Sequence, residues 1–196
     1  KIGEGAALMT ETRVETKVVS AVSSMLSSPV LERAMEAQIL AIGAPEFDDE
    51  DRAFAAAIRT TLTPEHIADT FWRVGLEVDP ELPLADFVVP LAQMRPAGSG
   101  STDVADVSWA VPTVQAWVTT CALGTPFHSW QLTAQGKSPA AHKGMIHAAK
   151  IMAATGRDLF ARPELLADAK AEHAAKLARE PYICPLEPEV MPPIPG

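Results

Sequence analysis

The first constraint on this sequence is a strand-like run near its start, GAALMTETRVETKVVSAV, which spans residues 5–22. Valines interleaved with threonine, glutamate and lysine are typical of a half-exposed β-strand. No turn or capping residue precedes the run, and one strand is not stable without neighbours in a sheet. We therefore expect the strands that pair with it to lie in polypeptide outside this sequence.

Helical periodicity follows, with recognisable starts and stops. Apolar residues recur three and four apart after Ser28-Pro29 and stop at Gly43, and a second such pattern runs from Ser138-Pro139 to about Thr155, with Gly156 as its stop. Residues 163–180 predict a last helix that begins at a proline. The short apolar run ADFVVPLAQ, residues 85–93, predicts a buried strand between these helices.

The acidic run FDDED, residues 47–51, begins another predicted helix. Asp48 or Asp49 suits the capping position, and acids in the first turn interact favourably with the helix dipole. Four adjacent acids on a helix point in different directions and cannot share one ion. We therefore interpret this cluster as a helix start and not as a metal site.

The centre of the chain joins a Gly/Ser-rich loop, a helical turn with Asp103 and Asp106, an alternating strand over residues 113–120, and the turn GTPFHSWQ. In α/β sheets, ligands bind beyond the carboxyl ends of strands, which is where His128 would lie. From the spacing alone, His128 is either a metal-binding or catalytic residue or a hydrogen-bonded structural imidazole. Asp103 is either a functional residue or the cap of the helix that follows it.

Charge and composition exclude several classes of protein. With 16 basic against 25 acidic residues, a pI near 5.0 and no Lys/Arg cluster, the sequence predicts no nucleic-acid partner. No apolar run is long enough to cross a bilayer and no signal segment opens the chain, so we expect no membrane partner and a cytoplasmic location. Cys121 and Cys184 match neither a disulfide framework nor a zinc spacing.

The other histidines show no chelating pattern. His142 and His147 are five residues apart, about 140° around a helix, so they cannot bind one ion together. We expect both to be surface or packing residues. His66 and His173 are likewise expected to lack a partner for chelating an ion.

Five segments together resemble the M20 family of metal-dependent amidohydrolases and peptidases. They are KIGEGAALMTET, SSPVLERAME, GSTDVADVSWAVPTVQ, GTPFHSWQLTAQGKSPAAHKGMIHAAKIMAAT and PYICPLEP. The resemblance implies an α/β fold: the C-terminal half of a three-layer, zinc-peptidase-like catalytic domain. Residues 1–24 would be the last strand of a lid and dimerisation domain. Residues 25–196 would be the returning part of the catalytic domain, with a proline-rich surface tail at 181–196.

The same resemblance implies a site. His128 matches the family's final metal ligand and would bind as a neutral imidazole. The metal would be zinc, with manganese or cobalt as alternatives, and the complete protein would hold two ions. A metal-activated water would cleave the amide bond of p-aminobenzoyl-glutamate or of a similar N-acyl amino acid or dipeptide. The residues implied to face substrate or to orient a ligand are Ser101, Thr102, Asp103, Asp106 and Thr125; Arg95 is a candidate for binding a substrate carboxylate by position only.

The sequence also departs from the family pattern. It contains neither the His-x-Asp segment nor the Glu-Glu pair that supply most metal ligands and the general base. We therefore expect no catalytic residue in this chain. The expected partner is the missing N-terminal half or a homologous subunit, in a homo- or heterodimer. Two alternatives stay open: a non-catalytic M20-like subunit that binds such amides, and a free-standing α/β interaction domain in which His128 is enclosed.

Overall fold

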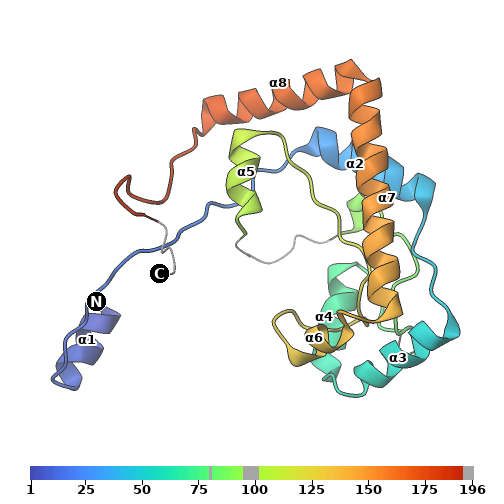
Figure 1. Ribbon diagram of the computed structural model, residues 1–196, viewed down its shortest axis with the longest axis horizontal. Coiled ribbons are helices and arrows are strands. Elements are labelled where there is room, and N and C mark those ends of the chain that lie inside the picture. Colours follow the sequence, from blue (N-terminus) through green and yellow to red (C-terminus); the bar gives the residue numbers. More distant parts are fainter. Residues whose placement is uncertain (80, 95–101, 192–196) are drawn as a thin grey trace.

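The computed structural model describes residues 1–79, 81–94 and 102–191, and this part of the chain folds into helices without a β-strand. None of the described helices has the length and apolarity needed to cross a bilayer. Helix α7 runs the length of the body, with α2 and α8 packed against it and α3, α4 and α6 near its first turns (Figure 1). The elements are α1 (Ile2–Met9), α2 (Pro29–Ile42), α3 (Asp49–Arg59), α4 (Pro64–Arg73), η1 (Leu91–Gln93), α5 (Val104–Ala110), α6 (Trp130–Gln135), α7 (Pro139–Ala161) and α8 (Pro163–Arg179).

Most predicted helix starts are confirmed. Pro29 and Pro139 occupy the first turns of α2 and α7, where a missing N–H costs nothing. The Ser138 hydroxyl accepts a hydrogen bond from the Ala141 N–H. Gly43 ends α2 with a φ of 84°, a conformation that favours glycine.

The predicted stop at Gly156 is wrong, because α7 continues to Ala161. Glycine inside a helix is unfavourable by only about 1 kcal/mol relative to alanine, so it does not end a well-packed helix. The effective stop is Pro163, whose ring disfavours the helical conformation at the preceding residue. Arg162 accordingly has φ −125° and ψ 83°, and α8 begins at the proline.

The predicted strand over residues 1–24 is wrong for its first part, where residues 2–9 form α1. Helix α1 has no buried residue and lies apart from the other helices (Figure 1). A helix satisfies its own backbone with local hydrogen bonds, whereas a strand needs a partner. Residues 13–22 have no regular structure, and their assignment to a lid domain remains a prediction.

The two other predicted strands are not formed within the described residues. Residues 112–120 have no helix or strand assignment, and residues 85–93 contain one bend and the 3-10 turn η1. The two segments still meet, since the Thr119 hydroxyl donates to the Ala85 carbonyl at 2.8 Å. A side chain makes this contact in place of a backbone ladder.

Helix α7 crosses the segment 112–120 at Gly144. A Cβ atom built on Gly144 would lie 2.0 Å from the Thr119 carbonyl oxygen and 2.9 Å from the Thr120 side chain. No other residue type fits this crossing without moving one backbone. Gly144 therefore fixes how closely the segment that leads to His128 approaches α7.

The core joins α3 and the first turn of α7 with the loops that carry Leu84 and Ala122. Leu84 and Ala55 are almost completely buried, as are Phe71 of α4 and Ile151 of α7. One cluster of contacting buried side chains comprises Phe47, Ala55, Ile58, Leu84, Ala122 and Ala140. Because the cluster includes Ala122, the core reaches the start of the turn that carries His128.

The segment between α1 and α2 is held to the body at residues 23–28. Helix α5 makes the first contacts: the Ser108 hydroxyl accepts from the Leu26 N–H at 2.8 Å, and the Trp109 indole donates to the Ser24 carbonyl at 2.7 Å. Both side chains thus bind the backbone of the segment that precedes α2.

Helix α8 holds the rest of the same segment. The Lys176 ammonium donates to the Ser27 carbonyl at 2.7 Å. The Glu172 carboxylate accepts from the Ser28 hydroxyl at 3.2 Å and from the Val30 N–H at 3.3 Å. These contacts of α5 and α8 with residues 23–30 are called the linker clamp below.

Candidate functional site

His128 lies on an exposed turn between residues 112–120 and α6. Its φ is 60°, in the left-handed region that non-glycine residues rarely adopt; among the described non-glycine residues, Glu11 is the other example. Within the described part of the chain, no hydrogen bond or ion pair engages its ring. The expectation of an enclosed structural imidazole therefore does not describe His128, whose ring nitrogens are open to a ligand.

The turn around His128 is held by its own hydroxyl groups. The Thr125 hydroxyl donates to the Ala122 carbonyl at 2.7 Å. The Ser129 hydroxyl donates to the Pro126 carbonyl at 2.7 Å and accepts from the Leu132 N–H at 3.2 Å, which caps α6. Thr125, implied by the family resemblance to serve the site, thus braces the turn.

The turn also packs against its neighbours. Gly124 has a φ of 92°, and a Cβ on it would lie 2.8 Å from the Ile67 side chain of α4. The Leu123 N–H donates to the Pro83 carbonyl at 2.8 Å. Close backbone contact with α4 and the 83–84 loop therefore fixes the base of the turn.

The loop residues implied by the resemblance lie elsewhere. Ser101 and Arg95 are outside the described residues. Asp103 is exposed and precedes α5 without making a side-chain capping bond, so the capping interpretation is not supported by a hydrogen bond. Instead, the Thr102 hydroxyl accepts from the Val104 N–H at 3.3 Å. Figure 1 places α5 beside α8, away from α6, so the structure does not bring Asp103 next to His128.

The Asp106 carboxylate accepts hydrogen bonds from two other parts of the chain. It accepts from the Tyr182 hydroxyl at 2.9 Å and from the Ser23 N–H at 3.4 Å. The hydrogen bond to Asp106 raises the pKa of Tyr182 to about 12, because it stabilises the protonated phenol. The Tyr182 ring lies 5.9 Å from the Trp109 ring, which places the first residues of the tail against α5.

Two histidines have structural roles. His147, buried in α7, donates through Nε2 to the Gly43 carbonyl at 2.9 Å, which satisfies the end of α2. His173 donates through Nε2 to the Ser108 carbonyl at 2.9 Å, a contact that joins α8 to α5. Across residues 1–79, 81–94 and 102–191, no three His, Cys, Asp or Glu side chains form a group that could hold a metal ion.

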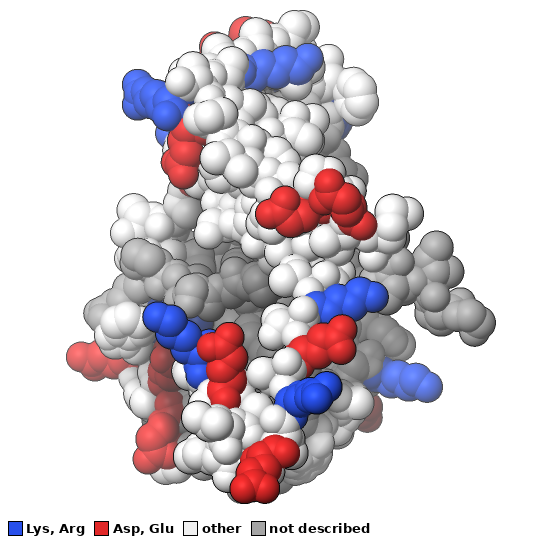
Figure 2. Space-filling model, turned by 90° about the vertical axis from the view of Figure 1, so that its left-hand side faces the viewer, with Lys and Arg blue, Asp and Glu red and all other residues white. Residues whose placement is uncertain are grey.

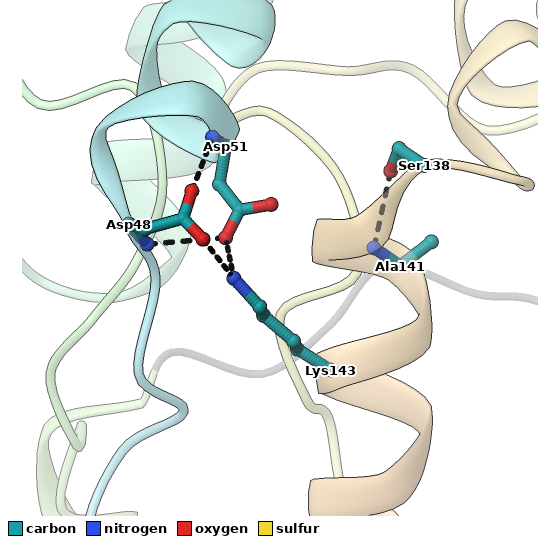
Figure 3. Close-up of polar contacts among 5 residues, drawn as sticks. All are labelled: Asp48, Asp51, Ser138, Ala141 and Lys143. Carbon is teal, nitrogen blue, oxygen red and sulfur yellow. Dashed lines mark hydrogen bonds and ion pairs between the residues drawn. The ribbon is translucent and has the colours of Figure 1, made fainter.

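A polar cluster joins the start of α3 to α7 (Figure 3). The Asp48 carboxylate accepts a hydrogen bond from the Asp51 N–H at 2.9 Å, and the Asp51 carboxylate accepts one from the Asp48 N–H. This capping box confirms the predicted helix start. The Lys143 ammonium contacts both carboxylates, at 2.6 Å for Asp48. Asp51 is almost fully buried, so Lys143 compensates a charge that water does not reach.

The pKa values in this cluster shift in opposite directions. Hydrogen bonding by Lys143 lowers the pKa of Asp48 below 3.8, and the Asp48 and Asp51 carboxylates raise the pKa of Lys143 above 10.5. A carboxyl with a lowered folded pKa stabilises the fold above 3.8 and loses that effect as the pH falls through its folded value. A lysine with a raised folded pKa stabilises it below 10.5 and loses that effect as the pH rises. The cluster therefore stabilises the fold across the neutral range.

We expect Asp51→Ala to lower the free energy of unfolding by about 1–2 kcal/mol, because the capping box loses one member and the Asp48 N–H loses its acceptor. Urea denaturation at pH 7 measures the change. Asp49→Ala is the matched control, an exposed acid in the same turn, and should change stability by less than about 0.5 kcal/mol. Equal losses in the two variants would contradict the role of Asp51.

Two hollows lie away from His128. One of about 230 Å³ is lined by Asp48, Glu50, Asp51, Phe54 and Pro139, and a smaller one of about 70 Å³ lies against α2. On the face seen in Figure 2, basic and acidic side chains are interspersed. Neither of these two hollows includes His128, which is an exposed residue.

Comparison with known proteins points to a class first. No family model matches the chain, and no solved structure matches it. Among curated proteins, the chain is similar to one component of a hydrolase. That relative is the B subunit of p-aminobenzoyl-glutamate hydrolase from Escherichia coli (strain K12), with 43% identity over 202 residues.

The alignment covers 98% of this chain and 42% of the relative. The chain thus spans less than half the length of the relative that it matches. The comparison confirms that the chain resembles this hydrolase subunit over almost all of its residues. The wider M20 assignment remains a prediction.

Proposed function

We propose that this chain forms the C-terminal part of a metal-dependent amidohydrolase of the M20 type. Its substrate would be p-aminobenzoyl-glutamate or a similar N-acyl amino acid or dipeptide. One observation carries the proposal: 98% of the chain aligns at 43% identity with a relative named for hydrolysis of p-aminobenzoyl-glutamate. The exposed ring of His128 supports it, because a metal ligand must present a free lone pair.

His128 is the residue of this chain that we assign to metal binding. A neutral imidazole nitrogen suits zinc, manganese or cobalt, with zinc our first choice. One imidazole does not hold such an ion tightly, since protein sites use three or four ligands. The remaining ligands would come from the rest of the polypeptide, and we propose two ions in the complete protein.

Divalent ions at such a site would lower the pKa of a bound water and polarise the scissile carbonyl. This chain would contribute by positioning the His128 imidazole. The braced turn holds the His128 ring outward, toward the wall that the remaining polypeptide would supply. The general base that takes the proton from water is expected in that polypeptide, because this chain lacks the family's Glu-Glu pair.

The other residues implied by the resemblance divide into two groups. Asp103 is exposed and Thr102 half-buried, so both remain able to face a substrate. Asp106 and Thr125 already bind partners within the chain, and we propose that they act by positioning the backbone around them. Among the described residues, this division narrows a substrate-binding test to Thr102 and Asp103, and Ser101, which lies outside them, stays a candidate.

We further propose that the segments 85–93 and 112–120 become strands of an α/β catalytic domain when the remaining polypeptide is present. Both have apolar sequences, and neither has a backbone ladder within the described residues. Residues 1–24 would be the last strand of the lid and dimerisation domain. The partner would be the N-terminal half of the same protein or a homologous subunit, within a dimer.

The 196-residue chain by itself is expected to be metal-poor and inactive, because a lone imidazole cannot supply a tight site. Elemental analysis after dialysis and an assay for release of p-aminobenzoate test this. A polypeptide of the relative's full length serves as the positive control. Turnover by the 196-residue chain would contradict the proposal that the other ligands and the base lie elsewhere.

A further inference from the structure

Gln135 is a buried amide at the end of α6, and only 2% of its surface is exposed. Its Oε1 accepts from the Ala122 N–H at 2.7 Å. Its Nε2 donates to the Thr125 hydroxyl and to the Gln131 carbonyl, both at 3.0 Å. Both donor hydrogens and the acceptor oxygen of this side chain are thus engaged.

These bonds hold one side of the turn that carries His128. Gln135 fixes Ala122 and Thr125 before His128, and the bond from the Ser129 hydroxyl to the Pro126 carbonyl spans His128 itself. His128 lies between the two fixed points in a left-handed conformation, which persists only where its surroundings impose it. The direction of the imidazole therefore depends on Gln135, although the two residues are not in contact by any described hydrogen bond.

We propose that Gln135 is the positioning residue for His128. The inference rests on the proposed function, in which His128 binds a metal ion. Replacing the amide by an apolar side chain of similar length leaves the Ala122 N–H buried without an acceptor, and the turn must open to hydrate it. The strained backbone of His128 then relaxes, and its ring no longer meets the position that the other ligands define.

The first experiment uses the 196-residue chain and needs no metal. Amide hydrogen exchange and backbone chemical shifts are measured by NMR in Gln135→Met and in Gln131→Met. Gln131 is the matched control, because its side chain makes one exposed hydrogen bond, to the Thr61 carbonyl at 3.3 Å. We expect the Ala122 amide to exchange on the order of 10- to 100-fold faster in Gln135→Met. The backbone chemical shifts of His128 should then be averaged over several conformations, and Gln131→Met should show neither change.

The second experiment uses the polypeptide of the relative's full length and titrates it with Zn²⁺. Gln135→Met should weaken zinc binding about 10- to 100-fold, the usual effect of losing a residue that orients a ligand. Ile151→Val, a destabilising change in the core of α7, controls for lost stability and should leave zinc affinity unchanged. A merely structural Gln135 would affect affinity no more than Ile151→Val does.

The outcomes separate the two proposals. Unchanged exchange at Ala122 in Gln135→Met overturns the positioning role whatever the metal result. Faster exchange with unchanged zinc affinity also overturns it, provided that His128→Ala loses zinc. If His128→Ala keeps full zinc affinity, the metal-ligand function fails, and with it the role of Gln135 in that function.

Discussion

Gly144→Ala is expected to destabilise the chain by about 3 kcal/mol, the upper range for inserting atoms into a packed site. The added Cβ would lie 2.0 Å from the Thr119 carbonyl oxygen, and the obstacle is backbone, which cannot rotate away as a side chain can. Either α7 or the segment 112–120 must shift. Urea denaturation at neutral pH measures the loss, and hydrogen exchange around Thr119 locates the displacement.

Gly156→Ala is the matched control for this prediction. Gly156 lies on the same helix, and a Cβ there meets nothing within 4 Å. Alanine has the higher helix propensity, so this variant should be more stable by up to about 1 kcal/mol. If the two variants change the free energy of unfolding in opposite directions, the effect of the close crossing is separated from that of helix propensity. A Gly144→Ala chain as stable as the wild type would show that α7 and the segment are further apart than described.

His128→Ala is expected to abolish metal binding and hydrolysis in the polypeptide of the relative's full length. Losing a ligand should weaken zinc affinity by more than the roughly 10- to 100-fold that follows loss of a residue orienting one. The change removes an exposed side chain that makes no described hydrogen bond, so the free energy of unfolding should move by less than about 0.5 kcal/mol without metal. Metal analysis, zinc titration and the rate of p-aminobenzoate release are measured together.

His142→Ala provides the control, since His142 is an exposed histidine on α7 and makes no described side-chain bond. It should keep wild-type metal content and rate. If His128→Ala also kept both, the assignment of the ligand would be wrong. If it kept the metal but lost the rate, His128 would contact substrate in place of the ion.

The sequence predicted the helix ends well because the residues that determine them are local. Ser138 and Asp48 act on N–H groups three residues away, so their effect is visible in a short stretch. The missed helix α4 carried the same kind of signal, Thr63 followed by Pro64, with the threonine hydroxyl accepting from the His66 N–H. Only Gly156 misled, because packing outweighs the propensity of one glycine.

The strands could not be predicted with the same success, because a strand depends on partners that its own residues do not specify. Residues 2–9 instead formed a helix, and residues 112–120 remained without a ladder. The residues of the site also differ in how far the sequence predicts them. His128 was identified through the family resemblance of its segment, whereas the role of Gln135 arises from a turn geometry that residue types alone do not reveal.

The linker clamp has a consequence for biosynthesis. Lys176 binds the carbonyl of Ser27, a residue 149 positions earlier in the chain. At ribosomal rates of about 5–20 residues per second, roughly 7–30 s therefore pass between the synthesis of Ser27 and that of Lys176. The linker is thus secured in two steps, first by the side chains of α5 and later by those of α8.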